Sequence, residues 1–507
     1  MISKRSSGIL AHITSLPSPF GIGDLGYSSQ KFLTFLKKSE QTYWQFLPTV
    51  PTSSIFDHSP YMSNSAFAGN PLLLSPDLLF EAGLINRATL NEYPELSPYR
   101  TEFKKVKRHK ELLLQKAFKN FLPAKESGFE KFRKENEWLS DYTLFKVAKE
   151  LFQSTAWSDW PTGISRRTSS NLVELKNSHR ERIEYYEFEQ YEYFRQWQLL
   201  KQEATRQDIQ LFGDLPIYVG YDSVDVWANQ DIFQLSKLTH RPTHVAGVPP
   251  DYFSKTGQRW GNPLYDWQNS SPIIKEQLLG WWAKRLQHLF TQVDVARIDH
   301  FRGFESYWSI PEENDTAVDG EWLKGPGISF FQEMRKRLGP MNIVAEDLGI
   351  ITEEVATLRD KLQFPGMKVL QFAFDGNLQN EFLPFNFKDP NSIVYTGTHD
   401  NDTTLGWFLS DQLNDNLRRD IKKQVNGYLN DYKKIHHDLI YLAQSSISKL
   451  CIFPLQDVLG FGNDCKMNSP GVPTGNWRWR CGEEFLNDEI SNYLRETTIS
   501  FGRGRKK

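Results

Sequence analysis

Short apolar runs rich in β-branched residues alternate along the chain with stretches of helical periodicity. This alternation is the pattern of a parallel sheet whose strands are connected by helices. The runs that fit strands are residues 9–15, 43–50, 209–219, 293–301, 342–348, 367–374, 392–399 and 449–455. The pattern therefore predicts an α/β protein with eight strands.

Two of the connecting helices can be placed by their first residues. Ser271 followed by Pro272 is an N-cap with proline at the first helical position, and one apolar face continues from there. Thr352 is predicted to cap a second helix through its hydroxyl, again before a single apolar stripe. Both helices are therefore expected to bury one side only.

Acidic residues distinguish between a closed barrel and an open sheet. At or near the C-terminal ends of four different predicted strands lie Asp214, Asp299, Glu346 and Asp400. In a closed (β/α)8 TIM barrel these ends converge on one mouth, where barrel enzymes carry out their chemistry. A doubly wound open sheet is the alternative for the same strands, and the acidic residues favour the barrel.

Two intervals are too long for a minimal barrel. Residues 70–205 are predicted to be a mostly helical insertion between the second and third strands, with 184–203 as the candidate for the barrel's own helix. Residues 229–267 are rich in proline and glycine and are predicted to be an ordered loop rather than a helix or strand. Long loops beside a barrel mouth are usually functional. Residues 1–507 are otherwise predicted to be one catalytic domain.

Composition and charge exclude several classes of protein. The formal net charge of −2 argues against a polyanion binder, so no nucleic acid partner is expected. The three cysteines form neither a disulfide framework nor a zinc pattern, and the sequence contains no signal peptide and no run of about 20 apolar residues. A cytoplasmic protein without a membrane partner is predicted. Aromatic residues make up 14% of the chain, more than one core needs, so rings are expected to line clefts.

The acidic residues have the chemistry of a retaining glycosidase. That reaction needs a nucleophilic carboxylate and a carboxylic acid, roughly 5–5.5 Å apart. Asp299 fits the nucleophile, because Arg297 points to the same side of its strand and can keep it ionised. Glu346 follows an apolar strand, and an apolar setting raises a glutamate's pKa toward the acid role. Asp400, beside His399, can stabilise the positive charge of the transition state.

Other interpretations of these motifs are weaker. A structural salt-bridge network is the alternative for the acidic residues. The string Gly21-Ile-Gly-Asp-Leu-Gly26 resembles a dinucleotide-binding motif, but two prolines separate it from the strand and no acidic residue ends the next strand. Neither His399 with Asp400 and Asp402, nor Asp299 with His300, has the spacing of a calcium loop. No metal and no cofactor are therefore predicted.

The chain resembles the 4-α-glucanotransferases, also called amylomaltases or disproportionating enzymes, of glycoside hydrolase family 77. The resemblance runs nearly end to end and is carried by long strings in one order: residues 8–18, 59–61, 65–71, 213–219, 246–254, 257–265, 296–303, 345–349, 396–403, 467–471 and 476–480. It implies a barrel without the C-terminal β-domain of the related α-amylases.

The resemblance also implies an activity and a set of site residues. Asp299 corresponds to the nucleophile, Glu346 to the acid/base and Asp400 to the transition-state stabiliser. The implied substrate-binding residues are Tyr61, Asp214, Asp251, Tyr252, Trp260, Arg297, His399 and Asn468. The segment from Tyr252 to Trp260 is expected to cover the acceptor side of the site.

The implied reaction is retaining transfer of a segment of an α-1,4-glucan to the 4-hydroxyl of glucose or another glucan, through a covalent glycosyl-enzyme. The expected partners are maltooligosaccharides and glucans derived from starch or glycogen. An α-amylase-type hydrolase and a non-catalytic glucan-binding protein are the alternatives.

Two short segments depart from the family's pattern. Residues 53–58 replace the family's Gly-Tyr-Gly, so a tyrosine associated with secondary glucan binding is missing and Phe56 is its nearest counterpart. Cys465-Lys-Met-Asn468 replaces the usual Ala-Arg-Met-Asn, which removes an arginine able to make bidentate contacts. Neither departure changes the three carboxylates.

Overall fold

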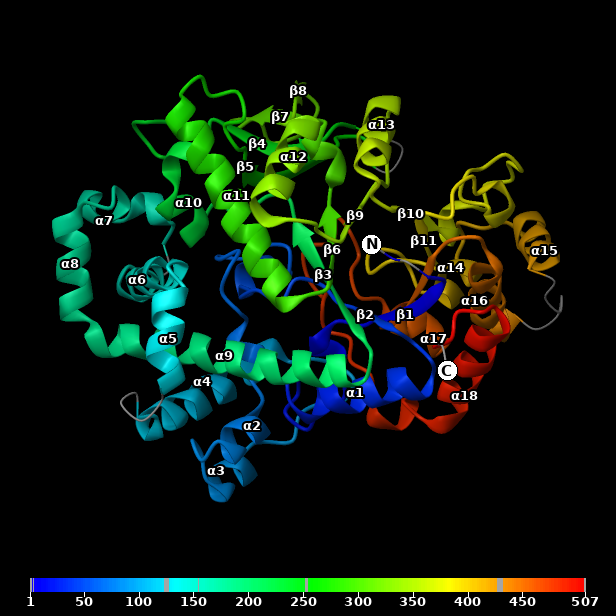
Figure 1. Cartoon of the computed structure of the whole chain (residues 1–507), viewed down its shortest axis with the longest axis horizontal. Helices are drawn as coiled ribbons and strands as arrows, with labels where there is room; N and C mark the ends of the chain where they lie inside the picture. Colours follow the sequence, from blue (N-terminus) through cyan, green and yellow to red (C-terminus); the bar gives the residue numbers. More distant parts are fainter. Residues whose placement is uncertain are drawn as a thin grey trace.

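The centre of the molecule is a ring of eight parallel strands in a computed structural model that describes residues 2, 4–122, 127–153, 155–250, 254–425 and 432–505 (Figure 1). The strands are β1 (Ser6–Leu10), β2 (Tyr43–Gln45), β3 (Gln210–Pro216), β6 (Val295–Asp299), β9 (Ile343–Ala345), β10 (Gly366–Val369), β11 (Ser392–Tyr395) and β12 (Leu450–Pro454). Each overlaps one predicted run, although β1 shares only Ile9 and Leu10 with the predicted run 9–15, and all are parallel to their neighbours.

The order of the strands closes the ring. The hydrogen-bonded ladder runs β10-β11-β12-β1-β2-β3-β6-β9, so only β9 and β10 lack a ladder between them. The N–H of Ala345 at the end of β9 donates to the carbonyl of Pro365 just before β10, at 2.9 Å. This bond joins the two ends, and the predicted (β/α)8 barrel is confirmed.

Most strands are shorter than predicted because their last residues leave the ladder at the mouth. Asp299 is the last residue of β6, and Glu346 comes directly after β9. Asp214 lies within β3, whereas Asp400 lies on the loop that follows β11. The barrel therefore delivers these four side chains to one end.

Helices cover the outside of the barrel and fill the interval before β3. Those between β2 and residue 180 are α2 (Pro76–Glu81), α3 (Arg87–Asn91), α4 (Phe103–Asn120), α5 (Ser127–Glu135), α6 (Trp138–Leu151), α7 (Thr162–Ser165) and α8 (Ser169–Ser178). The others are α1 (Tyr27–Lys38), α9 (Arg180–Arg206), α10 (Val224–Ala228), α11 (Pro272–Gln292), α12 (Gly327–Leu338), α13 (Glu353–Leu362), α14 (Thr404–Leu409), α15 (Asp415–Gln424), α16 (Ile435–Ser445), α17 (Leu455–Val458) and α18 (Asp488–Ser500). Figure 1 shows α4 to α8 on one side of the barrel, next to α9.

The two helix starts predicted from sequence differ in their capping. The Ser271 side chain accepts a hydrogen bond from the N–H of Ile274, so it caps α11 as predicted. The helix after Thr352 also begins where expected, but the Thr352 side chain accepts no bond from the helix backbone.

One connection lacks an α-helix: between β10 and β11, a stretch described throughout, the helical segments are only 3₁₀ turns at Leu370–Phe372 and Pro384–Asn386.

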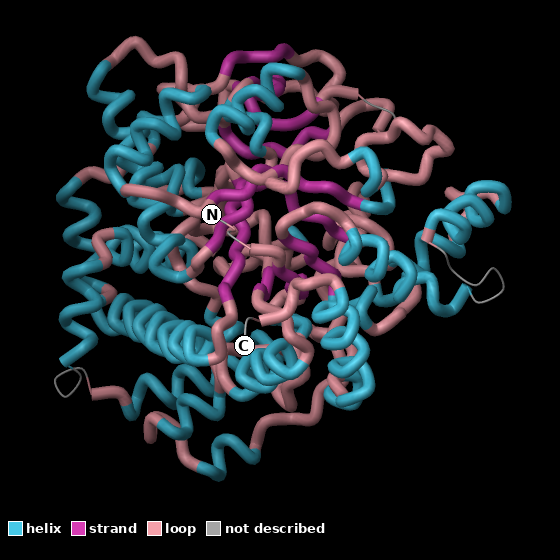
Figure 2. Tube along the Cα trace, turned by 45° about the vertical axis from the view of Figure 1, so that its right-hand side comes forward, coloured by secondary structure: helices cyan, strands magenta, loops and turns pink. Residues whose placement is uncertain are grey.

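A second, antiparallel sheet lies beside the barrel mouth. Its order is β5-β4-β7-β8, formed by β4 (His244–Val248), β5 (Gln258–Pro263), β7 (Ser306–Pro311) and β8 (Glu321–Lys324). Figure 2 shows these strands above the central ones. The prediction that residues 229–267 contain no helix or strand was wrong: β4 and β5 lie in this interval and pair with each other, and β4 also pairs with the distant strand β7, which follows β6 in the chain.

The described residues form no third sheet. Residues 455–505 are all described and contain no strand, so no β-domain follows β12 within them. In the described ranges, every helix is too short or too polar to cross a membrane.

Candidate active site

Neighbouring barrel strands bring the candidate residues together. In the ladder, Asp214 of β3 stands opposite Arg297 of β6, and Ile298 stands opposite Ala345 of β9. Asp299 and Glu346, each one residue further along its chain, therefore leave the barrel side by side.

Arg297 is the centre of the polar network. Its Nη1 donates to both carboxylate oxygens of Asp214, at 2.8 and 2.7 Å, and its Nη2 donates to Oδ1 of Asp299 at 2.7 Å. The side chain of Asp214 is 1% exposed and that of Asp299 is 30% exposed. Asp214 therefore anchors the arginine, while Asp299 is oriented by it and stays accessible from the mouth.

The pKa of Asp299 results from opposing effects of burial and neighbouring charges. Burial raises its pKa above the ordinary value of an aspartate, and the positive charge of Arg297 lowers it. The arginine acts in the direction predicted from the sequence, but burial is the larger effect and the net shift is upward. The negative charges of Asp214 and Asp400 also raise the pKa.

Glu346 is held by two backbone N–H groups. Its Oε2 accepts from His300 at 2.7 Å, and its Oε1 accepts from Leu348 at 3.0 Å. Burial nevertheless raises the pKa of Glu346 to about 7; the charge of Arg297 opposes this shift and that of Asp299 adds to it. A carboxyl group with this pKa is protonated in a large share of molecules near neutrality, as a general acid must be.

His300 makes this arrangement possible through its backbone. It adopts a left-handed conformation, with φ 53° and ψ 49°, directly after Asp299. Such a conformation is uncommon outside glycine and costs of order 1 kcal/mol or more. This left-handed conformation directs the N–H of His300 toward Glu346, while the preceding residue, Asp299, faces the mouth. No sequence pattern indicated this role, since it depends on a dihedral angle and not on the imidazole.

Asp400 approaches these carboxyl groups from the loop after β11. Its Oδ1 accepts from Nδ2 of Asn468 at 2.6 Å, and its Oδ2 lies 3.3 Å from Nε2 of His399. The side chain is 46% exposed. Because its charge raises the pKa of Asp299, the two carboxyl groups are within electrostatic reach of each other.

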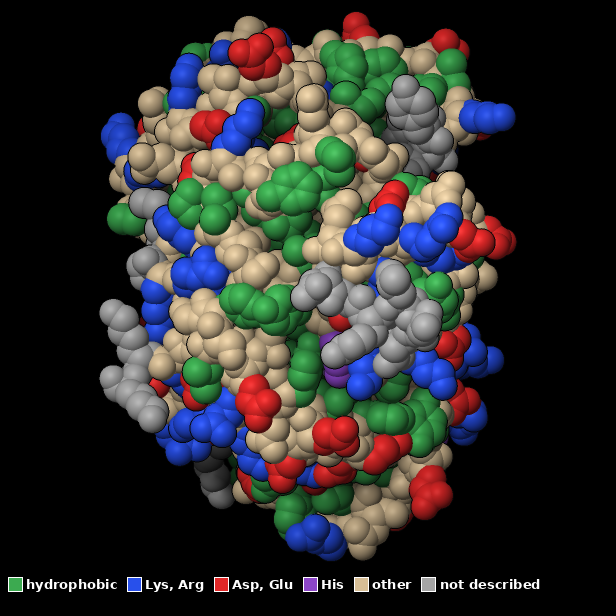
Figure 3. Space-filling model, turned by 90° about the vertical axis from the view of Figure 1, so that its right-hand side faces the viewer, with side chains coloured by type: hydrophobic (Ala, Val, Ile, Leu, Met, Phe, Trp, Pro, Cys, Tyr) green, Lys and Arg blue, Asp and Glu red, His purple; other side chains and the backbone are tan. Residues whose placement is uncertain are grey.

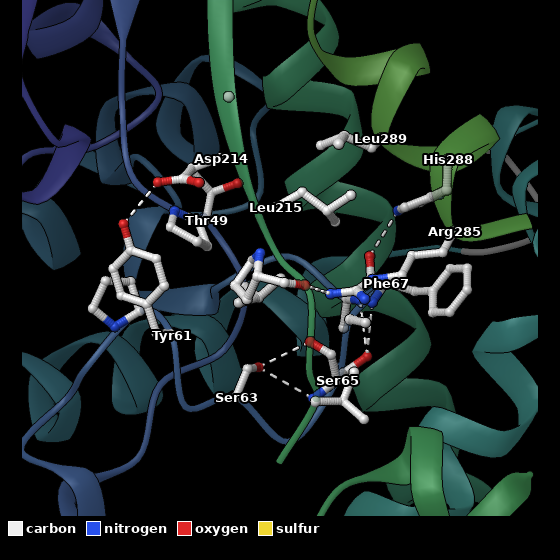
Figure 4. Close-up of a pocket in the computed structure, with 18 of the residues that line it drawn as sticks. Thr49, Tyr61, Ser63, Ser65, Phe67, Asp214, Leu215, Arg285, His288 and Leu289 are labelled. Carbon is white, nitrogen blue, oxygen red and sulfur yellow. Dashed lines mark hydrogen bonds between the residues drawn. The ribbon is translucent and has the colours of Figure 1, made fainter. Parts of the chain in front are cut away.

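Aromatic rings form a wall beside the carboxyl groups. The Tyr61 hydroxyl donates to Oδ2 of Asp214 at 2.7 Å, and Figure 4 shows it directed at that carboxylate from one end of a cavity. The Tyr61 ring is nearly parallel to that of His399, with 5.2 Å between centroids. Trp477 lies about equally far from both rings, at 6.0 and 6.1 Å.

Trp260, on β5 of the small sheet, lies next to the turn that follows Asp299. Its ring meets that of His300 edge to face, at 4.8 Å and 88°. The side chain is partly exposed, and its Nε1 donates to Gln258 at 3.2 Å. Two other predicted binding residues, Asp251 and Tyr252, lie outside the described residues.

The structure thus joins most of the predicted residues in one network. Direct contacts connect Tyr61, Asp214, Arg297, Asp299, His399, Asp400 and Asn468, and Glu346 and Trp260 both contact His300. The buried ion pair of Asp214 and Arg297 has a structural role. A purely structural salt-bridge network explains neither the exposure of Asp299 nor the raised pKa of Glu346. No metal-binding group of three His, Cys, Asp or Glu side chains occurs in the part of the chain that the structure describes.

Comparison with known proteins shows similarity to one family along nearly the whole chain. The family model Glyco_hydro_77, described as 4-alpha-glucanotransferase, matches residues 11–484. A 4-alpha-glucanotransferase of Synechocystis sp. is 46% identical over 511 residues, covering 99% of each protein, and one of Thermus thermophilus is 42% identical over 504 residues, covering 97% of each. The solved structure of an amylomaltase from Streptococcus agalactiae in complex with acarbose is 37% identical with a TM-score of 0.93, covering 99% of this chain and 100% of that one.

Proposed function

The chain belongs to the 4-alpha-glucanotransferase family, and on this premise we propose that it transfers a segment of an α-1,4-glucan to the 4-hydroxyl of glucose or another glucan. The observation that carries the proposal is the pairing of an accessible Asp299, oriented by Arg297, with a Glu346 whose pKa is raised to about 7. These are the two carboxyl groups that a retaining double displacement requires.

In the first half of the reaction, Asp299 attacks the anomeric carbon of the bound glucan while Glu346 protonates the departing glycosidic oxygen. The result is a glucan chain joined covalently to Asp299 and a free leaving glucan. In the second half, Glu346 removes the proton from the 4-hydroxyl of an acceptor, which then displaces Asp299. The configuration at the anomeric carbon is retained because it is inverted twice.

The surrounding residues hold the sugar and its developing charge. Asp400 and His399 provide hydrogen-bonding groups for sugar hydroxyls, and the negative charge of Asp400 stabilises the oxocarbenium-like transition state. Tyr61 presents a ring for stacking. Asp214, being 1% exposed, supports the site through Tyr61 and Arg297 rather than by reaching the sugar itself.

The proposed ligands are neutral maltooligosaccharides and α-1,4-glucans derived from starch or glycogen. Acidic and basic side chains are intermixed on the face shown in Figure 3, which suits an uncharged ligand. The cytoplasmic location predicted from the cysteine usage and the absence of a signal peptide stays a prediction.

The activity is expected to fall as the pH rises through about 7. Transfer begins with protonated Glu346, and the raised pKa of about 7 means that this form predominates below that pH and is lost above it. The measurement is kcat/KM for maltotriose as a function of pH, read as the behaviour of two interacting carboxyl groups. An alkaline limb far above pH 7 would show that Glu346 is not the acid.

Replacing Trp260 by alanine is expected to raise the proportion of hydrolysis several-fold relative to transfer. The ring covers the turn after Asp299, so its removal opens the acceptor side to water that competes for the covalent intermediate. The ratio of new reducing ends to elongated products, measured on maltotriose, reports the change. Trp322→Ala, in the same small sheet, is the control; an unchanged ratio in the Trp260 variant would refute its shielding role.

Chromatography of the products from maltotriose tests the function as a whole. A transferase produces chains both longer and shorter than the substrate, whereas an α-amylase-type hydrolase produces only shorter ones. Complete absence of turnover would favour a glucan-binding protein without catalysis.

A further inference from the structure

Residues 53–58, which depart from the family's sequence pattern, form a tight turn at the barrel mouth. The Ser53 hydroxyl accepts from the N–H of Ile55 at 3.3 Å, and the turn ends with two successive left-handed residues, Asp57 (φ 46°) and His58 (φ 61°). The ring of His58 stacks on Phe103 of α4, with 4.0 Å between centroids and 10° between planes. The turn is therefore fixed to the helices that precede β3.

The Asp57 carboxylate bridges this turn to a loop more than 400 residues away in the chain. Its Oδ2 accepts from the backbone N–H of Asn476 at 2.9 Å, and its Oδ1 accepts from Nη2 of Arg478 at 2.6 Å. The side chain of Asp57 is only 11% exposed, so these charge-assisted bonds are largely protected from water. The two donors are the residues on either side of Trp477.

Trp477 needs such support because its backbone is strained. Its φ of 62° is in the left-handed region, where a bulky residue costs about 1–3 kcal/mol and persists only if its surroundings hold it. Its N–H donates to the carbonyl of Met467 at 2.8 Å. In this conformation the indole lies beside Tyr61 and His399 of the proposed sugar site.

The same loop also carries the partner of Asp400. The side chain of Asn476 accepts from the N–H of Ser469 at 2.9 Å and donates to the carbonyl of Val472 at 2.8 Å, which braces the segment after Asn468. Asn468 donates through its backbone N–H to the carbonyl of His399 at 3.2 Å and through Nδ2 to Asp400. A continuous series of bonds therefore connects Asp57 to the Asp400 carboxylate.

We propose that Asp57 is a positioning residue for transfer: by clamping both neighbours of Trp477, it holds residues 466–480 so that Asn468 orients Asp400 and the indole stays against the sugar site. The proposal rests on the catalytic role proposed for Asp400. Asp57 itself touches no reacting atom. Its loss is expected to lower kcat more than it changes KM, because it moves a group that acts mainly in the transition state.

Two substitutions of Asp57 separate the carboxylate from the backbone conformation. Glycine and asparagine both tolerate a left-handed φ, so neither imposes new strain. Asp57→Gly removes both accepting oxygens and is expected to lower kcat for maltotriose between about ten- and a hundredfold, the range for a small misplacement of a reacting group. Asp57→Asn retains one accepting oxygen and is expected to lose less. Ile55→Ala, an exposed residue of the same turn, is the control with unchanged activity.

A double-mutant cycle with Asn468→Ala distinguishes positioning from a general structural role. If Asp57 acts through Asn468, then Asp57→Gly adds little to the loss already caused by Asn468→Ala, and the double variant stays within about twofold of that single variant. Multiplied losses, or a normal kcat in Asp57→Gly, would overturn the proposal. If Asp57→Gly does not fold, as judged by circular dichroism, the same cycle is run with Asp57→Asn, and multiplied losses there would overturn the proposal equally.

Asp400→Asn separates failure of this proposal from failure of the proposed function. An active Asp400→Asn enzyme would reject the catalytic role of Asp400. An inactive Asp400→Asn enzyme together with a fully active Asp57→Gly enzyme would reject only the clamp.

Discussion

Asp299→Asn is expected to lower kcat on maltotriose by about four orders of magnitude or more, because the amide cannot form the covalent glycosyl-enzyme. The change is nearly isosteric, and Arg297 keeps both of its bonds to Asp214, so the barrel is expected to fold normally. The measurement is initial transfer rate at saturating maltotriose, with thermal unfolding as the test of folding.

Asp315→Asn is the matched control, since Asp315 is exposed and lies outside the network. The Asp299 variant is also expected to remain inactive on a maltosyl fluoride, whose leaving group needs no protonation. Near-normal turnover of either donor would show that Asp299 is not the nucleophile.

Glu346→Gln is expected to lower kcat on maltotriose by about 10²–10⁴-fold, the usual contribution of a general acid. The single amide oxygen of glutamine can accept only one of the two backbone bonds, from His300 or from Leu348, and the amide has no acidic proton to give to the departing oxygen. Release of fluoride from a maltosyl fluoride is expected to be impaired much less. This difference between donors separates the acid from the nucleophile.

Glu313→Gln is the matched control, because Glu313 is exposed and makes no contact with the carboxyl groups of the site. Equal losses on maltotriose and on the fluoride would show that Glu346 does not act by protonating the leaving group.

The barrel could be predicted from the sequence because its signals are local. Each strand is a short apolar run, and each acidic residue lies at or near the C-terminal end of such a run. Because Asp214, Asp299 and Glu346 lie at or near the C-terminal ends of neighbouring strands, a closed barrel brings them to one mouth. The predicted joining of these residues into one polar cluster followed from that alone.

The features that could not be predicted depend on distant partners or on backbone angles. Strands β4 and β5 need β7 to complete their sheet, and β7 is separated from them by α11 and β6. The left-handed turns at His300 and Trp477 are held by bonds to Glu346 and to Asp57, residues that no spacing rule connects to them. At Thr352 a local signal was present but the expected bond was not formed. Threonine is a good capping residue and precedes the helix as predicted, yet its hydroxyl accepts no bond from the helix backbone.

The circular order of the strands has a consequence for how the protein is made. Ser6 of β1 pairs with Leu450 of β12, 444 positions later in the chain. While the polypeptide emerges from the ribosome, one edge of β1 has no partner until β12 has been synthesised, and unpaired strand edges invite association with other chains. Such distant pairing slows folding. Newly made molecules are therefore most exposed to association with other chains during the interval before β12 pairs with β1.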